Sequence, residues 1–164
     1  MLNRVMQGAA AGAAGTTALN AVTYLDMALR ARPSSSTPEQ VVEQLAQRAG
    51  IEVPGQGDQR QNRLQGLAAL SGLATGVLVG AVAGQLRFAV LRLGPVLGSV
   101  LLGGGAMAAT DLTMARLGVS DPRSWDATAW ASDAIPHLAF GTTTYLTLAA
   151  MSRRAGRRAA SRAR

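Results

Sequence analysis

The amino-acid sequence predicts an all-α integral membrane protein: a four-helix bundle with a short amphipathic helix in its first long loop and a disordered basic C-terminal tail. Hydrophobic residues make up 48% of the 164 residues and charged residues only 15%, whereas a typical soluble domain has about 25% charged residues. Four apolar segments are long enough to cross a bilayer, which takes about 20 residues. They run over about 5–29, 64–86, 90–115 and 134–151.

The first segment, about 5–29, is the least hydrophobic because alanine and glycine dominate it. It follows Arg4 and is rich in small residues, so a cleaved signal peptide is an alternative interpretation. The apolar core of a signal peptide is short, whereas here the small residues continue directly into Leu19, Val22 and Leu25. We therefore expect a first membrane span.

The polar connection between the first two spans predicts one extramembrane helix, about 38–49. Residues 37–40 (Thr-Pro-Glu-Gln) form a capping-box pattern with proline at the first helical position, and Gly50 is a typical C-terminal stop. Apolar residues at helical spacing indicate an amphipathic helix at the bilayer surface or at the ends of the spans. The polar, turn-rich stretch 54–62 predicts a loop.

Two features flank the fourth span. Asp121-Pro122 is a helix-start signal, and Trp125 and Trp130 follow it. Because tryptophan is enriched at membrane interfaces, we expect a short interfacial helix there. The tail, 152–164, carries six arginines, no acid and no aromatic residue. It predicts a disordered segment that contacts anionic lipid headgroups rather than nucleic acid.

The residues that the chain lacks exclude several kinds of chemistry. With no cysteine, disulfides, thiolate metal sites and thiol catalysis are impossible. All 16 basic residues are arginine, and the absence of lysine excludes Schiff-base chemistry and a Walker-type phosphate loop. One histidine cannot build a multi-histidine metal site. We expect neither a bound metal nor a cofactor.

Arginine placement predicts an orientation in the membrane with both termini inside the cell. Cytoplasmic segments of membrane proteins carry the excess of positive residues. In this orientation the arginines inside are Arg4, Arg87, Arg92, Arg153, Arg154, Arg157, Arg158, Arg162 and Arg164. Those outside are Arg30, Arg32, Arg48, Arg60, Arg63, Arg116 and Arg123.

Glycines recur at a spacing of four in three of the spans. The set comprises Gly72, Gly76, Gly80 and Gly84 in the second span, Gly8 and Gly12 in the first, and Gly94 and Gly98 in the third. Because little hydrophobic drive acts between helices in lipid, small residues that allow close backbone approach favour helix packing. The pattern predicts packing within the bundle. A seam between copies in a homo-oligomer and a pore-lining glycine zipper are the alternatives.

Ionisable residues within the spans are few and fall at one end of the predicted bundle. Such groups are costly in lipid and are candidates for function. The candidate polar or ion site comprises Asp26, Asp111, Asp133 and His137, with Asn20 on the stripe that leads toward Asp26. An imidazole beside carboxylates is a plausible proton acceptor near neutral pH. Two or three carboxylates with one imidazole also suit a divalent cation.

One alternative is that these groups form a surface that binds a partner. The other is that each of these groups has a structural role. The expected pairs would then be Asp26 with Arg30, Asp111 with Arg116 (or a loop cap), and His137 with Asp133.

Several segments together resemble a known group of proteins. They are ALNAVTYLD at 18–26, RPSSSTPE at 32–39, Asn62-Arg63 before the glycine-rich span, and WASDAIPHLAFG at 130–141. This combination resembles small, uncharacterised four-span membrane proteins of high-GC bacteria, over most of the chain except the tail. The resemblance implies an integral protein of the cytoplasmic membrane and carries no activity.

These observations favour a non-enzymatic membrane protein, that is, an accessory, assembly or scaffold subunit. Its expected partners are the lipid bilayer and either further copies of itself or another membrane protein. The alternative is a small oligomeric transporter or channel that uses the aspartates and the histidine for protons or a cation. A membrane enzyme acting on lipid is a third hypothesis, supported only by the carboxylates at the outer end.

Overall fold

The computed structural model describes the backbone of residues 2–162 and the side chains of residues 2–154 and 161. This part of the chain is all-α, without a strand. The elements in order are α1 (Leu2–Arg30), α2 (Thr37–Arg48), α3 (Gly57–Gln85), α4 (Arg87–Arg92), α5 (Gly94–Leu117), the 3₁₀ turn η1 (Pro122–Ser124) and α6 (Ala127–Arg162).

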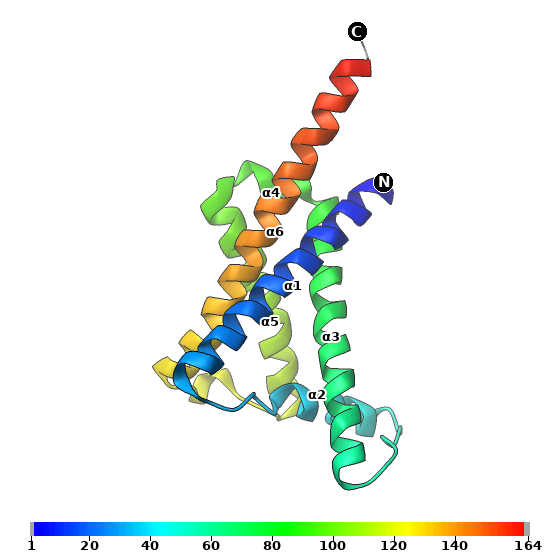
Figure 1. The fold of residues 1–164 in the computed structure, drawn as a ribbon, viewed down its shortest axis with the longest axis vertical. Helices are drawn as coiled ribbons and strands as arrows, with labels where there is room; N and C mark the ends of the chain where they lie inside the picture. Colours follow the sequence, from blue (N-terminus) through cyan, green and yellow to red (C-terminus); the bar gives the residue numbers. More distant parts are fainter. Residues whose placement is uncertain (1, 163–164) are drawn as a thin grey trace.

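The four long helices run alternately in opposite directions, so the start of α1 and the end of α6 lie at the same end of the molecule (Figure 1). Contacts are extensive between α1 and α3, between α1 and α6, and between α5 and α6, whereas α3 and α5 touch only slightly. The helices therefore follow the order α3–α1–α6–α5 and do not close a symmetric bundle. Two of them, α3 and α5, are long and apolar enough to cross a membrane. These two stand at the ends of the row.

The second and third predicted spans have different boundaries in the structure. Helix α3 begins at Gly57, so the loop prediction for 54–62 is wrong from that residue onward. Asp58 lies in the first turn, where its charge complements the helix dipole. The third segment is divided, because Gly94 adopts a left-handed φ of +75° between α4 and α5, a conformation that glycine tolerates best.

The fourth segment is one long helix, α6, of 36 residues. The predicted interfacial helix before it is only the 3₁₀ turn η1, which Asp121 caps by accepting from the Arg123 backbone N–H. The prediction of a disordered tail over 152–164 is wrong up to residue 162, because α6 continues that far, and 163–164 lie outside the described residues. Alanine and arginine are both strong helix formers, so the tail composition is compatible with helix.

Helix α2 lies across the ends of α3 and α5 (Figure 1). Glu43 forms an ion pair with Arg60 of α3. Arg48 donates to the backbone carbonyl of Arg116, near the end of α5, at 3.2 Å. These contacts place α2 at the ends of the long helices, one of the two positions that the sequence predicts.

The two ends of α2 differ in how well the sequence predicted them. The N-cap is Ser36, whose backbone is right-handed helical and whose side chain caps no backbone N–H, so the capping-box prediction at 37–40 is wrong. Gln40 instead donates its side-chain amide to Ser36 Oγ at 3.0 Å. The predicted stop at Gly50 is confirmed by its φ of +67° and by the bond from Ile51 N–H to the Ala46 carbonyl.

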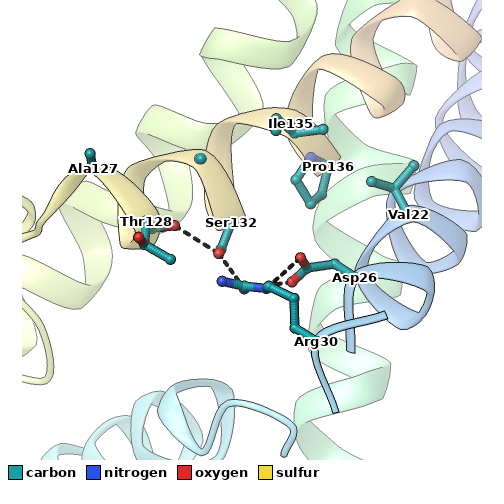
Figure 2. Close-up of a pocket in the computed structure, with 9 residues that line it drawn as sticks. Val22, Asp26, Arg30, Ala127, Thr128, Ser132, Ile135 and Pro136 are labelled. Atoms are coloured by element: carbon teal, nitrogen blue, oxygen red, sulfur yellow. Dashed lines mark hydrogen bonds and ion pairs between the residues drawn. The ribbon is translucent and has the colours of Figure 1, made fainter. Parts of the chain in front are cut away.

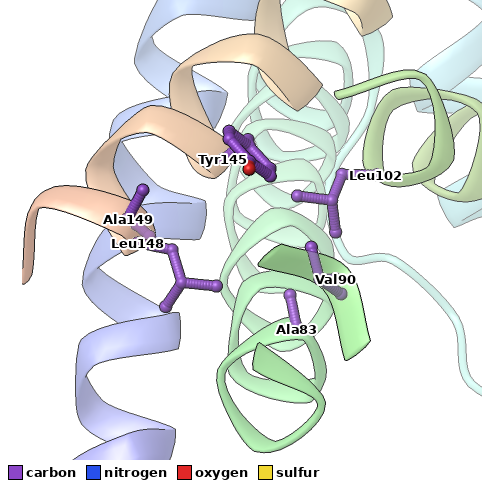
Figure 3. Packing of buried hydrophobic residues seen from close by; sticks show 7 residues of the cluster. Ala83, Val90, Leu102, Tyr145, Leu148 and Ala149 are labelled. Atoms are coloured by element: carbon purple, nitrogen blue, oxygen red, sulfur yellow. The ribbon is translucent and has the colours of Figure 1, made fainter. Parts of the chain in front are cut away.

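The buried core is small and lies where α1, α3, α4, α5 and α6 approach one another (Figure 3). One cluster within it consists of Ala11, Ala83, Val90, Leu102, Tyr145, Leu148 and Ala149. Leu64, Ala68, Ala106, Leu117 and Phe140 are also buried. Most large apolar side chains of α3 and α5 point outward instead, and Leu70, Leu78 and Leu97 are each more than 60% exposed. Water-soluble monomers rarely expose such continuous apolar surface. This outward apolar surface on α3 and α5 is compatible with a lipid environment.

Candidate functional site

Helices α1 and α3 cross where their glycines face one another. A Cβ atom on Gly8 would collide with the backbone of Gly80 and Gly84, and a Cβ on Gly12 would collide with Gly76 and Gly80. A Cβ on Gly80 or Gly84 would in turn meet the backbone of α1. In this arrangement α1 covers the glycine face of α3. That face is then closed to a second copy of the chain.

Two glycines of the predicted packing set lie outside any such contact. A Cβ on Gly72 would meet nothing within 4 Å, because α1 crosses α3 obliquely and leaves this end of the stripe uncovered. Gly94 likewise has open space around it and serves the left-handed turn between α4 and α5. Spacing alone does not distinguish a packing glycine from one that permits a turn.

A second close contact joins α5 and α6. A Cβ on Gly141 would collide with the backbone of Ser99 and Gly103, and a Cβ on Gly103 would meet the carbonyl of His137. Gly98 faces the ring of Tyr145. Glycine spacing did not predict the contact of Gly103 with Gly141, because the two residues stand on different helices and belong to no common repeat.

Asp26 lies in a group of its own at the end of α1. Arg30 Nε and Arg32 Nε both bind the Asp26 carboxylate at 2.7 Å. Arg30 also donates to Ser132 Oγ on α6 at 2.7 Å. The Asp26–Arg30 pair is the one expected from the sequence if Asp26 has a structural role. The pairing of Asp26 with Arg32 was not predicted. These bonds tie the end of α1 to the start of α6.

A groove of about 380 Å³ opens beside this group, between α1 and α6. Figure 2 shows Val22 and Asp26 on one wall and the first turns of α6 on the other. Its lining residues are Val22, Asp26, Arg30, Ala127, Thr128, Ala131, Ser132, Ile135 and Pro136. The polar groups at its mouth are already paired with one another.

Asp111, Asp133 and His137 form a separate group between α5 and α6. His137 Nδ1 lies 2.9 Å from the Asp133 backbone oxygen and 3.4 Å from its Oδ1. Asp111 and His137 are both buried, at 7% and 8% exposure. Asp111 lies within electrostatic range of this pair across the α5–α6 interface, and it accepts a long bond of 3.5 Å from Thr110. The other carboxylate oxygen of Asp133 is shielded and has no hydrogen-bond partner in the described part of the chain.

The predicted site therefore divides into two parts. Asp26 is neutralised by two arginines, while Asp111, Asp133 and His137 stay together. Asn20, expected on an inward stripe, is exposed, because the contact of α1 with α3 ends near Thr16. Within residues 2–162 as described, no three acidic or histidine side chains are arranged to hold a metal ion.

The loop before α6 contains an ion pair outside the long helices. Arg123 binds both carboxylate oxygens of Asp121, at 2.9–3.1 Å. The hydrogen bond from the Arg123 side chain lowers the pKa of Asp121 below its usual value. Trp125 and Trp130 pack edge to face beside this pair, with ring centroids 5.3 Å apart. Together they give the loop a fixed shape at the end of the molecule opposite the termini.

Comparison with known proteins returns no match from protein-family models, from curated proteins or from solved structures.

Proposed function

We propose that the chain is a non-enzymatic integral membrane protein that acts as a scaffold or accessory subunit, with α1, α3, α5 and α6 as four spans. The observation that carries this proposal is the outward apolar surface of α3 and α5, the outer members of the row. Lipid or the helices of another membrane protein would cover that surface. Helices α1 and α6 are less apolar because neighbours on both sides shield them from lipid.

The arrangement of charged groups supports a scaffold over a catalyst. Asp26 is held by two arginines, and Asp121 is held by Arg123. The closest helix contacts are made by backbone against backbone at glycines, which fixes the helices in one arrangement. A rigid helical frame with a broad apolar exterior is suited to holding a partner helix in the membrane.

The scaffold role is tested by gentle extraction with native lipid, followed by measurement of the mass and composition of the intact particle. We expect a stable complex with a second membrane protein. A particle that contains this chain alone, and that carries ions when reconstituted, would contradict the proposal.

The proposed topology can be tested directly because the chain has no cysteine. The single variants Asn3→Cys, Ser34→Cys and Ser124→Cys place thiols at exposed positions. In intact cells, a membrane-impermeant maleimide should label the Ser34 and Ser124 variants, and it should label the Asn3 variant only after permeabilisation. The unmodified chain is the blank. The opposite pattern would invert the topology, and labelling of all three variants only after permeabilisation would argue against insertion.

A second candidate function is proton- or cation-linked transport, favoured by Asp111. This carboxyl is buried in one of the two most apolar helices and lies near the Asp133–His137 pair of another helix. Ionisable groups at such positions commonly serve proton or ion pathways.

The two functions differ in one measurement on proteoliposomes. The scaffold proposal expects flux under a pH gradient to equal that of protein-free liposomes. Transport instead requires flux that Asp111→Asn and His137→Gln each reduce to background. Asp121→Asn is the matched control, since Asp121 lies in the loop outside the long helices. Flux that survives both core substitutions would exclude this group as the pathway.

A further inference from the structure

The acidic residues gather at one end of the molecule, whereas arginines stand at both ends. All nine acidic residues lie toward the end opposite the termini, at positions 26, 39, 43, 52, 58, 111, 121, 126 and 133. The other end carries Arg4 at the start of α1, Arg87 and Arg92 in α4, and Arg153 and Arg154 in α6. No carboxylate side chain is available there to pair with them. This end therefore has a strong positive potential and fits an anionic partner.

Two of these arginines are gathered around one aromatic ring. The guanidinium carbons of Arg4 and Arg87 each lie 5.0 Å from the centroid of the Phe88 ring, within the range of a cation–π interaction. Phe88 is itself 60% exposed. Both positive charges therefore contact the same exposed apolar ring.

The glycine contact between α1 and α3 brings these side chains together. A Cβ on Gly84 would collide with the backbone carbonyl of Arg4, so the start of α1 lies directly against the end of α3. Gln7 then accepts a hydrogen bond of 3.3 Å from Arg87. The Nε of Arg87 is shielded from solvent and has no acceptor among the described residues. Within the described part of the chain, Arg87 therefore has one hydrogen-bond donor without a partner, and Arg4 stands at the same ring without a carboxylate nearby.

We propose that Arg4, Arg87 and Phe88 form a binding site for the phosphate of an anionic phospholipid. The two guanidinium groups would hold the phosphate, and Phe88 would lie at the boundary between headgroups and acyl chains. This inference rests on the proposed membrane insertion. It assigns lipid contact to a fixed site between α1 and α4, in addition to the basic tail.

The surroundings favour a lipid over a soluble phosphate or a nucleic acid. Leu86 and Val82, two and six residues before Phe88, are 56% and 59% exposed, so exposed apolar side chains lead from the arginines back toward α3. A phospholipid presents a phosphate and an acyl chain in that same order. A free phosphate would use only the arginines, and a nucleic acid would leave the apolar surface uncovered.

The test uses the full-length chain purified with lipid and exposed to equal amounts of phosphatidylglycerol and phosphatidylcholine. Native mass spectrometry then gives the ratio of the two lipids retained on the protein. The double variant Arg4→Gln/Arg87→Gln should reduce the preference for phosphatidylglycerol on the order of tenfold, given the usual contribution of an arginine at a membrane surface. The matched control is Arg92→Gln/Arg153→Gln, which removes the same charge at the same end and should keep most of the preference.

A third variant, Phe88→Leu, keeps both charges and an apolar side chain but removes the ring. It should lower the preference by less than the double arginine variant. Equal losses in the two arginine pairs would overturn the site in favour of diffuse charge. Release of the bound lipid by millimolar inorganic phosphate or by an RNA oligonucleotide would also overturn it, because those ligands lack the acyl chain.

Failure of the site and failure of the proposed function give different results. If alkaline carbonate extracts the chain from membranes, membrane insertion itself is wrong. If the chain stays in the membrane and the wild type retains both lipids equally, only the phosphate site is wrong.

Discussion

Replacing Gly80 with alanine should destabilise the protein more than any other single methyl group added to α3. The new Cβ would lie within 2.6 Å of the Gly12 backbone and would also collide with the Gly8 carbonyl. Both obstacles are backbone atoms, so no side-chain rotation relieves them. Overpacking of this kind costs about 1–3 kcal/mol, and α1 cannot move away without disturbing its contact with α6. We expect a clear fall in the melting temperature, measured by circular dichroism on the protein in lipid nanodiscs.

Gly72→Ala is the matched control for that experiment. It adds the same methyl group to the same helix and the same four-residue repeat, but nothing lies within 4 Å of it. Alanine is favoured over glycine in a helix interior by about 1 kcal/mol, so this variant should be unchanged or slightly more stable. Equal melting temperatures for the two variants would mean that α1 does not occupy the glycine face of α3.

The second large effect is expected for Gly141→Ala at the contact of α5 with α6. Its Cβ would lie 2.5 Å from the Gly103 backbone nitrogen and would collide with the Ser99 carbonyl. Separation of the helices at this point would also loosen the nearby Asp111 and His137. We expect a loss of stability of about 1–3 kcal/mol and an increase in hydrogen exchange of the α5 amides.

Substitution of two further glycines of α5 should reduce stability less, according to the space around each of them. Gly104→Ala should be tolerated, because its Cβ would meet no atom within 4 Å. Gly98→Ala should fall between the two, since its Cβ would approach the Tyr145 ring at 2.5 Å and a side chain can shift where a backbone cannot. A different order of stabilities would show that α5 and α6 pack in another register.

The helical content could be predicted from the sequence because it depends on local patterns. Runs of alanine, leucine and glycine uninterrupted by charge mark the long helices, and Gly50 marks the end of α2 through its own backbone preference. Helix ends were less predictable. Residues 57–62 are polar and resemble a loop, yet they belong to α3, since polar residues extend a helix readily where it leaves the apolar region.

Contacts between helices could be predicted only in part, because spacing identifies a face and leaves its partner unknown. The repeat in α3 suggested a packing face, but only the folded chain shows that Gly8 and Gly12 fill it and that Gly72 lies beyond the crossing. The same limit applies to the polar groups. Asp26 lies at the same end of the helices as the other candidate site residues. However, Arg32, six residues away, turns back across the end of α1 to bind it.

The order α3–α1–α6–α5 has a consequence for biogenesis. The first and the last long helices to leave the ribosome are neighbours in the middle of the row. Helices α1 and α3 can pair early, whereas α5 has its main contact with α6 and little with α3. During synthesis α5 therefore lacks its main partner until α6 has been made. A chain that ends before Ala127 would leave α5 and one side of α1 uncovered, and such a truncated product should be degraded more readily than the full chain.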